Sequence, residues 1–586
     1  MPTSPATPPR SRRRGLALSA LAGGAGVALV IAILAAEAAA LGAPPSPRPS
    51  RMVGDLVPAL VSTRPHALAP CTGAFVPHEL PHVSRARGTR TVLFDANGAG
   101  LAVADLDGDG RLDVVLADLA GPLTVLWNAT VPGGTWAFEA ATLPLRGAQA
   151  VVAVDVEGNG RLDLVTTQRS GTVARLRNLG ERAFVFEPLP GVRAPAYAMA
   201  WGDLDGDGRL DLVVASYDAA RERESRDGAL FGAPGGVVVF LARDEYFEPQ
   251  RLRDGAQALA LLLFDATGDG RQEVVVGHDF HIRDDVFARD PDGTWKLLTP
   301  FARTSANTMS LDAGDIANTG RESLFSTDMK PVRRDGATLA AWMPLMQKAY
   351  ERDLPHDGQR AENALQVPVG AAGSRWSEEA TRRGVDASGW SWAGRFGDLD
   401  NDGWLDLYVA TGMIAEDLLA HLPDGTLREP NVVFRNRGVA APGSFERITR
   451  WGLDDDASGR SVVLADLTGD GRLDVVVNTL GSPARVFENR TCGGRAVTID
   501  LRWPASANAF AVGASVTADV PGLGRPTRAV RAGAGYLSGD PPRLHLGVGD
   551  AHAPIALTVR WPDGARSELS LPTGSHAVVT REASSP

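Results

Sequence analysis

A nine-residue phrase rich in carboxylates and glycines recurs along the chain. Its first copy reads Asp105-Leu-Asp-Gly-Asp-Gly-Arg-Leu-Asp113, with acids at positions 1, 3, 5 and 9 and glycines at positions 4 and 6. Carboxylates at alternating positions converge on one point only where the backbone turns sharply, and glycine permits that turn. A shell of oxygens with several carboxylates suits a hard cation of flexible geometry, so the phrase predicts Ca²⁺ rather than Mg²⁺ or Zn²⁺. An EF-hand begins in the same way but needs Glu at position 12 and flanking helices, whereas the residues that flank this phrase are typical of strands.

Six copies of the phrase carry a ligand set, and one more copy, the fifth along the chain, which begins at Asp315, has lost most of its own. That copy has Ala317, Thr319 and Ser323 where ligands belong, so we expect it to hold no metal. In the other six copies the expected ligands are the side chains at positions 1, 3, 5 and 9 and the carbonyl group at position 7. These residues are Asp105, Asp107, Asp109, Arg111 and Asp113; Asp155, Glu157, Asn159, Arg161 and Asp163; Asp203, Asp205, Asp207, Arg209 and Asp211; Asp265, Thr267, Asp269, Arg271 and Glu273; Asp398, Asp400, Asp402, Trp404 and Asp406; and Asp466, Thr468, Asp470, Arg472 and Asp474.

The loops that begin at Asp105, Asp203 and Asp398 are expected to bind best, because each carries four Asp. A structural alternative is that Asp-Gly turns simply make good hairpins. That alternative does not explain a third and a fourth acid at fixed spacing, since like charges so close together repel in the absence of a metal. Six bound Ca²⁺ would move the formal charge from −11 to about +1. The predicted role of the metal is structural, and the apo protein should be much less stable.

The residues around each phrase predict strands. A short apolar run such as residues 151–154 leads in, and a β-branched run such as residues 475–477 leads out. A third strand and a fourth, aromatic strand follow, as at 173–178 and 184–187. Four short strands in roughly 50 residues describe one propeller blade, so seven copies predict a seven-bladed, all-β propeller over residues 71–492. The alternating short apolar runs of 493–586 predict a small C-terminal β-domain.

The two ends of the repeat region are expected to meet. The seventh copy lacks a fourth strand, and residues 74–81 resemble the fourth strand of the second repeat, residues 183–190. With both ends aligned on that repeat, Cys71 and Cys492 fall on neighbouring positions of one hairpin turn. The sequence therefore predicts that the N-terminal strand completes the last blade and that the two cysteines form a disulfide, the alternative being two unpaired buried thiols.

The N-terminus reads as a targeting segment. Four arginines between Arg10 and Arg14 precede an apolar stretch from Leu16 to Ala36 and then small residues to Ala43. This is the layout of an export signal peptide, although about 20 apolar residues are also long enough for an uncleaved membrane anchor. Residues 1–43 are thus a signal or an anchor, and the Pro-rich residues 44–70 are expected to be a linker. A net charge of −11 argues against a nucleic-acid partner.

The repeats resemble the FG-GAP/VCBS-type repeats of integrin α-subunit propellers. Residues 310–413 look more specifically like the cartilage-acidic-protein-1-like group, through the phrases at 326–331, 363–366 and 389–394. The tail, residues 497–581, resembles an ASPIC/UnbV domain, through Val512-Gly-Ala-Ser, Gly533-Ala-Gly-Tyr-Leu-Ser, Leu544-His-Leu-Gly and Val559-Arg-Trp-Pro-Asp-Gly. The resemblance implies a calcium-loaded propeller, an extracellular or cell-envelope location and a role in adhesion or interaction.

No catalytic constellation is evident. The chain lacks a Gly-x-Ser-x-Gly elbow and a phosphate-binding Gly loop, and its His-Glu-x-x-His run, residues 78–82, begins in the predicted strand at 74–81 and not on a helix. His278 and His281, with Asp279, Asp284 and Asp285, are either a polar loop or a metal or acid–base site. Trp390 and Trp392 are expected to be core residues rather than sugar platforms, and His545 a strand or turn residue.

The sequence predicts an extracellular or envelope module that binds a protein or glycan partner through one propeller face. The alternative is a hydrolase or lyase that uses the propeller as a scaffold to act on polysaccharide or lipid. Acids or histidines converging in the central channel would favour the enzyme, and exposed aromatic patches would favour binding. The Met- and aromatic-rich insertion at 331–365 is either a partner site or a lid packed on its blade.

Overall fold

A computed structural model describes residues 55–86, 90–131, 135–226, 235–280, 282–350, 358–370 and 375–582. The expected signal or anchor at 1–43, the first part of the expected linker and His281 lie outside these residues. Within them, no helix has both the length and the apolar character needed to cross a membrane.

Over the described residues the repeats fold into seven sheets, each built on four antiparallel strands, and two of these sheets gain a short fifth strand (β22, Met329–Lys330, or β38, Ser538–Gly539), which confirms the predicted seven-bladed propeller. In each blade the metal phrase joins the first strand to the second. The blades, first strand to fourth, are β3 (Leu101–Ala104), β4 (Asp113–Leu116), β5 (Pro122–Asn128) and β6 (Phe138–Arg146); β7 (Ala148–Val154), β8 (Asp163–Gln168), β9 (Val173–Gly180) and β10 (Ala183–Glu187); β11 (Ala198–Gly202), β12 (Asp211–Ala215), β13 (Gly236–Ala242) and β14 (Phe247–Asp254); β15 (Ala258–Phe264), β16 (Glu273–His278), β17 (Asp285–Arg289) and β18 (Trp295–Leu298); β20 (Leu311–Gly314), β21 (Ser323–Ser326), β24 (Ala364–Val369) and β25 (Arg375–Glu378); β26 (Gly389–Gly397), β27 (Asp406–Thr411), β30 (Val432–Asn436) and β31 (Phe445–Ile448); and β32 (Gly459–Ala465), β33 (Asp474–Thr479), β34 (Pro483–Arg490) and β2 (Ala74–Val83).

Burial explains the order of the strands within a blade. The first and second strands are continuous apolar runs, and every residue of β15 and β16 is buried. The fourth strands alternate or are largely exposed, as in β14 and β10. A strand covered on both faces needs apolar side chains on both, whereas an outer strand needs them on one.

The ring closes as predicted. Strand β2 pairs antiparallel with β34, from Ala74 opposite Arg490 to Val83 opposite Pro483. Cys71 and Cys492 form a disulfide with their Cα atoms 5.1 Å apart, across a sequence separation of 421 residues. The bond therefore staples the two ends of the propeller at its last blade.

Removal of this staple has a measurable consequence. The variants Cys71→Ser and Cys492→Ser are each expected to lower the free energy of unfolding by about 4 kcal/mol or more, because an open chain of this length gains much loop entropy on unfolding. Urea unfolding of the oxidised protein measures the change. The reduced wild-type protein should reproduce it, and equal midpoints for oxidised, reduced and variant chains would contradict it.

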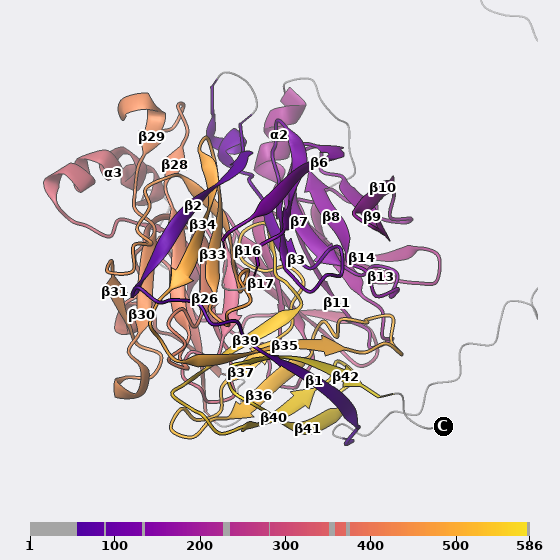
Figure 1. Cartoon of the computed structure of the whole chain (residues 1–586). Helices are drawn as coiled ribbons and strands as arrows, with labels where there is room; N and C mark the ends of the chain where they lie inside the picture. Colours follow the sequence, from indigo (N-terminus) through magenta and orange to yellow (C-terminus); the bar gives the residue numbers. More distant parts are fainter. Residues whose placement is uncertain are drawn as a thin grey trace, which may run out of the picture. The chain divides into compact units, whose positions relative to one another are not determined.

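The C-terminal domain contains two four-stranded sheets. One has the order β1 (Ala59–Pro65), β42 (Ser575–Arg581), β35 (Arg495–Arg502) and β39 (Arg543–Gly549), and the other β37 (Thr527–Ala529), β36 (Ser515–Asp519), β40 (Ile555–Arg560) and β41 (Arg566–Leu571). Part of the expected linker is therefore a strand, since β1 pairs antiparallel with β42 (Figure 1). The prolines on either side of the run Leu-Val-Ser-Thr made this segment look like a linker. Because β1 lies at the edge of its sheet, it tolerates a proline at its end.

The remaining elements are short. They are η1 (Leu93–Ala96), η2 (Pro423–Gly425), η3 (Gly438–Ala440), α2 (Asp218–Arg226), α3 (Gly336–Tyr350), α4 (Ala380–Arg383) and the strands β19 (Thr304–Ser305), β22 (Met329–Lys330), β23 (Gln359–Arg360), β28 (Met413–Ile414), β29 (Thr426–Leu427) and β38 (Ser538–Gly539). Helix α3 lies in the 331–365 insertion and packs on the sixth blade. Its Trp342 is 3% exposed, lies 6.2 Å from Trp390 between ring centroids and donates a hydrogen bond to Glu429. The described part of the insertion is a lid rather than a free arm.

Candidate metal centres

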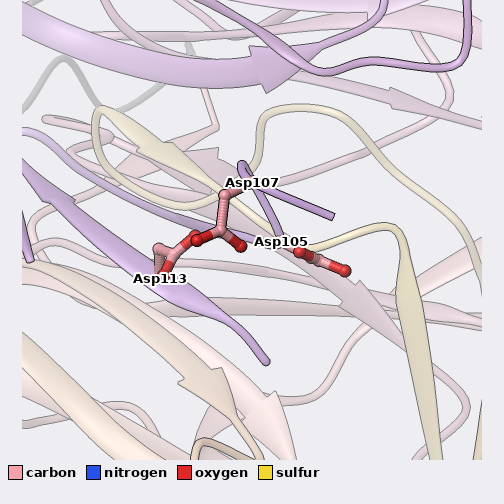
Figure 2. Close-up of side chains that lie close together, drawn as sticks. All are labelled: Asp105, Asp107 and Asp113. Atoms are coloured by element: carbon pink, nitrogen blue, oxygen red, sulfur yellow. The ribbon is translucent and has the colours of Figure 1, made fainter. Parts of the chain in front are cut away.

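Three of the phrase loops bring carboxylates together. In the first loop, one oxygen from each of Asp105, Asp107 and Asp113 lies within 4.8 Å of the others, and Figure 2 shows these three side chains side by side. The loops at Asp203 and Asp398 repeat the arrangement with the same three positions of the phrase. They are the three loops expected to bind best, and in each the acids at positions 1, 3 and 9 converge.

The backbone of the loop holds these acids in place. Both oxygens of Asp105 accept backbone N–H groups, from Gly108 at 2.8 Å and Gly110 at 3.0 Å. These glycines have φ values of +79° and +87°, which side-chain-bearing residues rarely adopt. Asp113 accepts N–H groups from Leu106 at 3.0 Å and Asn128 at 2.8 Å. Each carboxylate oxygen has a second lone pair, so these bonds leave room for a cation.

The acid at position 5 lies differently. Asp109 accepts the backbone N–H of Arg111 and forms an ion pair with its guanidinium group, and Asp402 pairs with Arg435 at 2.7 Å. The structure thus does not gather the position-5 acid with those at positions 1, 3 and 9, and the position-7 carbonyl stays a predicted ligand.

The electrostatics of the three clusters are those of a cation site. Burial, reinforced by the neighbouring acids, raises the pKa of Asp113 to about 7 and that of Asp211 to about 8. The pKa of Asp398 is raised well above its ordinary value for the same two reasons. The Oδ1 atoms of Asp398 and Asp400 are buried and have no hydrogen-bond partner among the described residues. Two orphaned carboxylate oxygens beside a raised pKa fit a hard cation well.

The second blade carries a built-in cation in place of an open site. The Arg175 guanidinium bonds Asp163 at 2.7 Å and lies 3.2 Å from Glu157. Its positive charge therefore neutralises the acids at positions 9 and 3 of this phrase. The other blades whose phrase carries a ligand set have Val at the corresponding place, as at Val125 and Val486. This substitution was a sequence signal that the count of acids missed.

The fourth, fifth and seventh loops also differ from the three clusters. In the described residues of the fourth and seventh, three acid oxygens do not converge. Asp470 is paired with Arg472, and Glu273 accepts the backbone N–H groups of Ala266 and Thr267. In the decayed fifth loop, Asp315 accepts three backbone N–H groups, two from its own loop and one from Thr527 at 3.2 Å. That acid anchors the C-terminal domain.

A recurrent asparagine links four of the phrase loops to a neighbouring loop, and the sequence alone assigned it no role. The Nδ2 atom of Asn128 donates to the carbonyl of Leu112 in its own loop and to that of Leu467 in the adjacent blade, at 3.0 and 2.9 Å. Asn178, Asn436 and Asn489 make the same pair of bonds. The signal was the recurrence of Asn at the end of the third strand.

Comparison with known families agrees with the repeats and the tail. A family model for ASPIC and UnbV matches residues 499–586, and one for an FG-GAP-like repeat matches residues 105–166, 155–214 and 416–477. The chain is a propeller of FG-GAP-like repeats that ends in an ASPIC/UnbV domain. Neither component is a typical catalytic family.

The chain is also weakly similar to cartilage acidic protein 1. It is 29% identical to the Homo sapiens protein over 126 residues, or 21% of this chain and 19% of the relative, and 31% identical to the Xenopus tropicalis protein over 114 residues, or 19% and 17%. The match spans less than a fifth of either relative. Similar solved structures include BBS1N in complex with ARL6DN (TM-score 0.39, 10% identity, 71% of this chain and 97% of that one) and YCF48 bound to D1 peptide (0.36, 10%, 72% and 97%).

The ASPIC/UnbV domain, together with β1, lies on the phrase loops. Side chains of this domain bond the carbonyl of the position-6 glycine in four blades: Arg64 to Gly110, Ser506 to Gly208, Arg560 to Gly270 and His545 to Gly471, at 3.1–3.4 Å. Backbone bonds join it to two more loops, from Gly549 to Asn401 and from Arg525 to Asn318. The candidate metal loops are therefore sandwiched between the propeller and this domain.

A loop of the same domain, residues 532–539, enters the centre of the propeller, and we call it the plug. It contacts first strands around the ring: Ala532 bridges Trp201, Gly535 bridges Leu311, and β38 pairs in parallel with Leu101 and Ala102 of β3. A Cβ on Gly539 would meet the Cα of Val152 at 2.8 Å, so glycine is needed for this close approach. The tail phrase at 533–538 thus has a structural role that its sequence did not reveal.

Tyr536 is the centre of the plug. It is fully buried, its hydroxyl lies 2.9 Å from that of Tyr197, and its ring centroid lies 5.1 Å from that of Trp392. Its carbonyl accepts a hydrogen bond from Ser461 at 2.8 Å. Three blades therefore hold this one side chain and its backbone.

A segment of the propeller crosses the other end of the first strands; we call residues 90–98 the strap. Its Thr91 carbonyl accepts the N–H of Glu416, its Ala96 carbonyl accepts Nε of Arg460, and its Asp95 pairs with Arg169 at 2.5 Å. These partners belong to the sixth, seventh and second blades. Plug and strap fill the channel with side chains that are already bonded.

The His/Asp cluster is structural in its described part. His278 is fully buried, its Nε2 lies 3.0 Å from Asp285, and its Nδ1 accepts the N–H of Gln257. Both ring nitrogens are therefore used. Trp390 and Trp392 are 5% and 1% exposed, so they are core residues as expected.

Three histidines at the ASPIC/UnbV domain make its stability depend on pH. Burial lowers the pKa of His545 to about 3 and those of His66 and His576 to about 4. The unfolded chain binds these protons near pH 6.5 and the folded chain does not, so stability is full above about pH 6.5 and falls below it. Each histidine should cost up to about 2 kcal/mol at pH 5.

Urea unfolding at pH 7 and pH 5 measures this effect. The variant His545→Gln keeps a donor for the Gly471 carbonyl but takes up no proton, so it should lose about 2 kcal/mol less than the wild type between the two pH values. His552→Gln, at an exposed site in the same domain, should behave as the wild type. Equal losses for His545→Gln and the wild type would contradict the assignment.

Proposed function

We propose that the chain is a calcium-stabilised interaction module of the cell surface or extracellular space, which binds a protein or a glycan. The observation that carries the calcium proposal is the pair of orphaned carboxylate oxygens on Asp398 and Asp400, in a loop whose geometry recurs at Asp105 and Asp203. All-oxygen donors with several carboxylates favour Ca²⁺ over transition metals. When bound, the ion supplies positive charge that lets three or four close acids ionise together.

The residues of the chain turn that charge into stability. The acids at positions 1 and 9 are fixed by backbone N–H groups of their own loop, and the position-9 acid also holds the third strand. The outer side of the same loops carries the ASPIC/UnbV domain. Neutralising the acids should therefore stabilise the strand junctions and the docking of that domain together.

Three observations support an exported location and an interaction role. The Cys71–Cys492 disulfide is typical of an oxidising compartment. The sequence of residues 1–43 predicts an export signal or an anchor. The similarity to cartilage acidic protein 1 points in the same direction. Because the ASPIC/UnbV domain occupies the loop side, we place the partner on the side of the strap.

The test is binding of the calcium-loaded full chain to arrays of extracellular proteins and of glycans, with and without EGTA. We expect binding that EGTA reduces by at least about tenfold, equivalent to 1.4 kcal/mol. A substitution within the strap, residues 90–98, should weaken this binding. Phe186→Ala, on the exposed outer strand β10, should leave it unchanged. Absence of binding on both arrays by calcium-loaded protein would overturn the interaction role.

A further inference from the structure

A pocket lies beside the strap, at the end of the first strands away from the phrase loops. Its volume is about 110 Å³, and a cavity needs about 10–15 Å³ to hold a single water. The pocket therefore has room for a group of several waters or for one small ring. Its walls come from the strap and from blades two and three, and they include Phe94, Asp95, Gln149, Arg169, Tyr197 and Tyr217.

Gln149 is the unexplained residue of this pocket. It lies in β7, is 7% exposed, and its side-chain amide has no hydrogen-bond partner among the described residues. The amide reaches the open space of the pocket, where water or a ligand can bond it. An amide offers donors and an acceptor, which two neighbouring hydroxyl groups of one molecule can satisfy together.

The aromatic walls present their apolar surfaces to the same space. The Tyr217 hydroxyl donates to Asp279 at 2.6 Å, and the Tyr197 hydroxyl is engaged by Tyr536. Because both hydroxyl groups are already hydrogen-bonded, the two tyrosines present ring carbons to the pocket. Phe94 packs against Tyr217 with a centroid distance of 5.7 Å.

An ion pair completes the wall. Asp95 and Arg169 are bonded at 2.5 Å, and their side chains are 13% and 21% exposed. The pair contributes no net charge but offers carboxylate oxygens and N–H groups in directions that hydroxyl groups can reach. Besides ring carbon, the lining thus offers an unpaired amide, this ion pair and the guanidinium of Arg221, which pairs with Asp218 at 2.9 Å.

We propose that this pocket binds a single sugar ring, the terminal monosaccharide of a glycan. A pyranose has an apolar C–H face for the aromatic carbons and hydroxyl groups for Gln149 and the ion pair. The space suits one ring and is too small for an extended peptide segment. This inference rests on the proposed function and specifies its ligand class and its site.

The test is saturation-transfer NMR and titration of the calcium-loaded full chain with glucose, galactose, mannose, N-acetylglucosamine and glucuronate. At least one sugar should bind with a Kd of about 1 mM, an ordinary affinity for so few contacts. Gln149→Leu should weaken that binding at least about tenfold while it leaves the melting temperature unchanged, because the amide has no hydrogen-bond partner in the folded chain to lose. Phe94→Ala should also weaken binding, and its matched control Phe186→Ala, on the exposed fourth strand β10, should not.

Each other outcome overturns the inference. These outcomes are no binding by any of the five sugars, equal binding by Gln149→Leu and the wild type, and binding of an array peptide, but no sugar, that Gln149→Leu abolishes. Melting with and without EGTA is recorded on the same samples. If the calcium-dependent stabilisation is present but sugars do not bind, the sugar site fails while the calcium module stands; if the stabilisation is absent, the proposed function itself fails.

Discussion

Removal of calcium is expected to lower the melting temperature of the full chain by about 7–11 °C. Three sites held at roughly 100 to 1,000 times their Kd contribute about 2.7–4.1 kcal/mol each, or about 8–12 kcal/mol together. An unfolding entropy near 2.1 cal/mol/K per residue gives roughly 1.1 kcal/mol/K for a folded part of this size, which converts that energy into the shift. Calorimetry in Ca²⁺, in Mg²⁺ and in EGTA measures it, and Mg²⁺ should restore little of the loss.

Single substitutions divide this effect among the loops. Asp398→Ala removes a position-1 acid and should abolish about a third of the calcium-dependent rise, whereas Asp254→Ala, an acid with an 87% exposed side chain, should leave it unchanged. Asp155→Ala should change it little, because Arg175 already serves the acids of that loop. A rise that is the same in Asp398→Ala and in the wild type would place the calcium elsewhere.

Loss of the Tyr536 ring is expected to be strongly destabilising. Tyr536→Ala empties a fully buried site at the centre of the plug and should cost about 3–5 kcal/mol of unfolding free energy. Because the plug joins the ASPIC/UnbV domain to the first strands, that domain should also become more sensitive to protease. Urea unfolding and limited proteolysis of the calcium-loaded chain measure the two effects.

Two further variants make the test specific. Tyr536→Phe removes only the hydroxyl and should cost about 1–2 kcal/mol, since it leaves the Tyr197 hydroxyl without this partner. Tyr246→Ala removes a 52% exposed ring and should stay within about 0.5 kcal/mol of the wild type. Should Tyr536→Ala unfold like Tyr246→Ala, the plug would not hold the domains together.

The sequence was sufficient for the propeller because the repeat is local and regular. Each phrase fixes a hairpin between two strands, and seven phrases in register define seven blades, so the strand at 74–81 could be assigned to the last blade before its pairing with β34 was known. The same register placed Cys71 beside Cys492. Composition misled only at β1, where prolines surround a short strand that needs the distant β42 as its partner.

The candidate site could be predicted only in part. The phrase itself sets which residues offer ligand oxygens, whereas the side chains that compete with a metal for those oxygens come from other strands and from the C-terminal domain. The acids of the loops at Asp105, Asp203 and Asp398 were expected to converge, and at positions 1, 3 and 9 they do. Arg175 acts across two strands, so its effect on Asp163 could not be read from the phrase alone. The covering of the loops by the ASPIC/UnbV domain depends on contacts such as His545 with Gly471, which join residues 74 positions apart.

The most direct measurement is a metal count on the full chain after dialysis against buffer with trace calcium, by inductively coupled plasma mass spectrometry. The wild-type protein should retain at least three Ca²⁺ per chain, and the triple variant with Asp105, Asp203 and Asp398 each changed to Ala should retain about three fewer. Equal counts for the two proteins, or a wild-type chain that retains no calcium, would show that these clusters are ordinary hairpin turns.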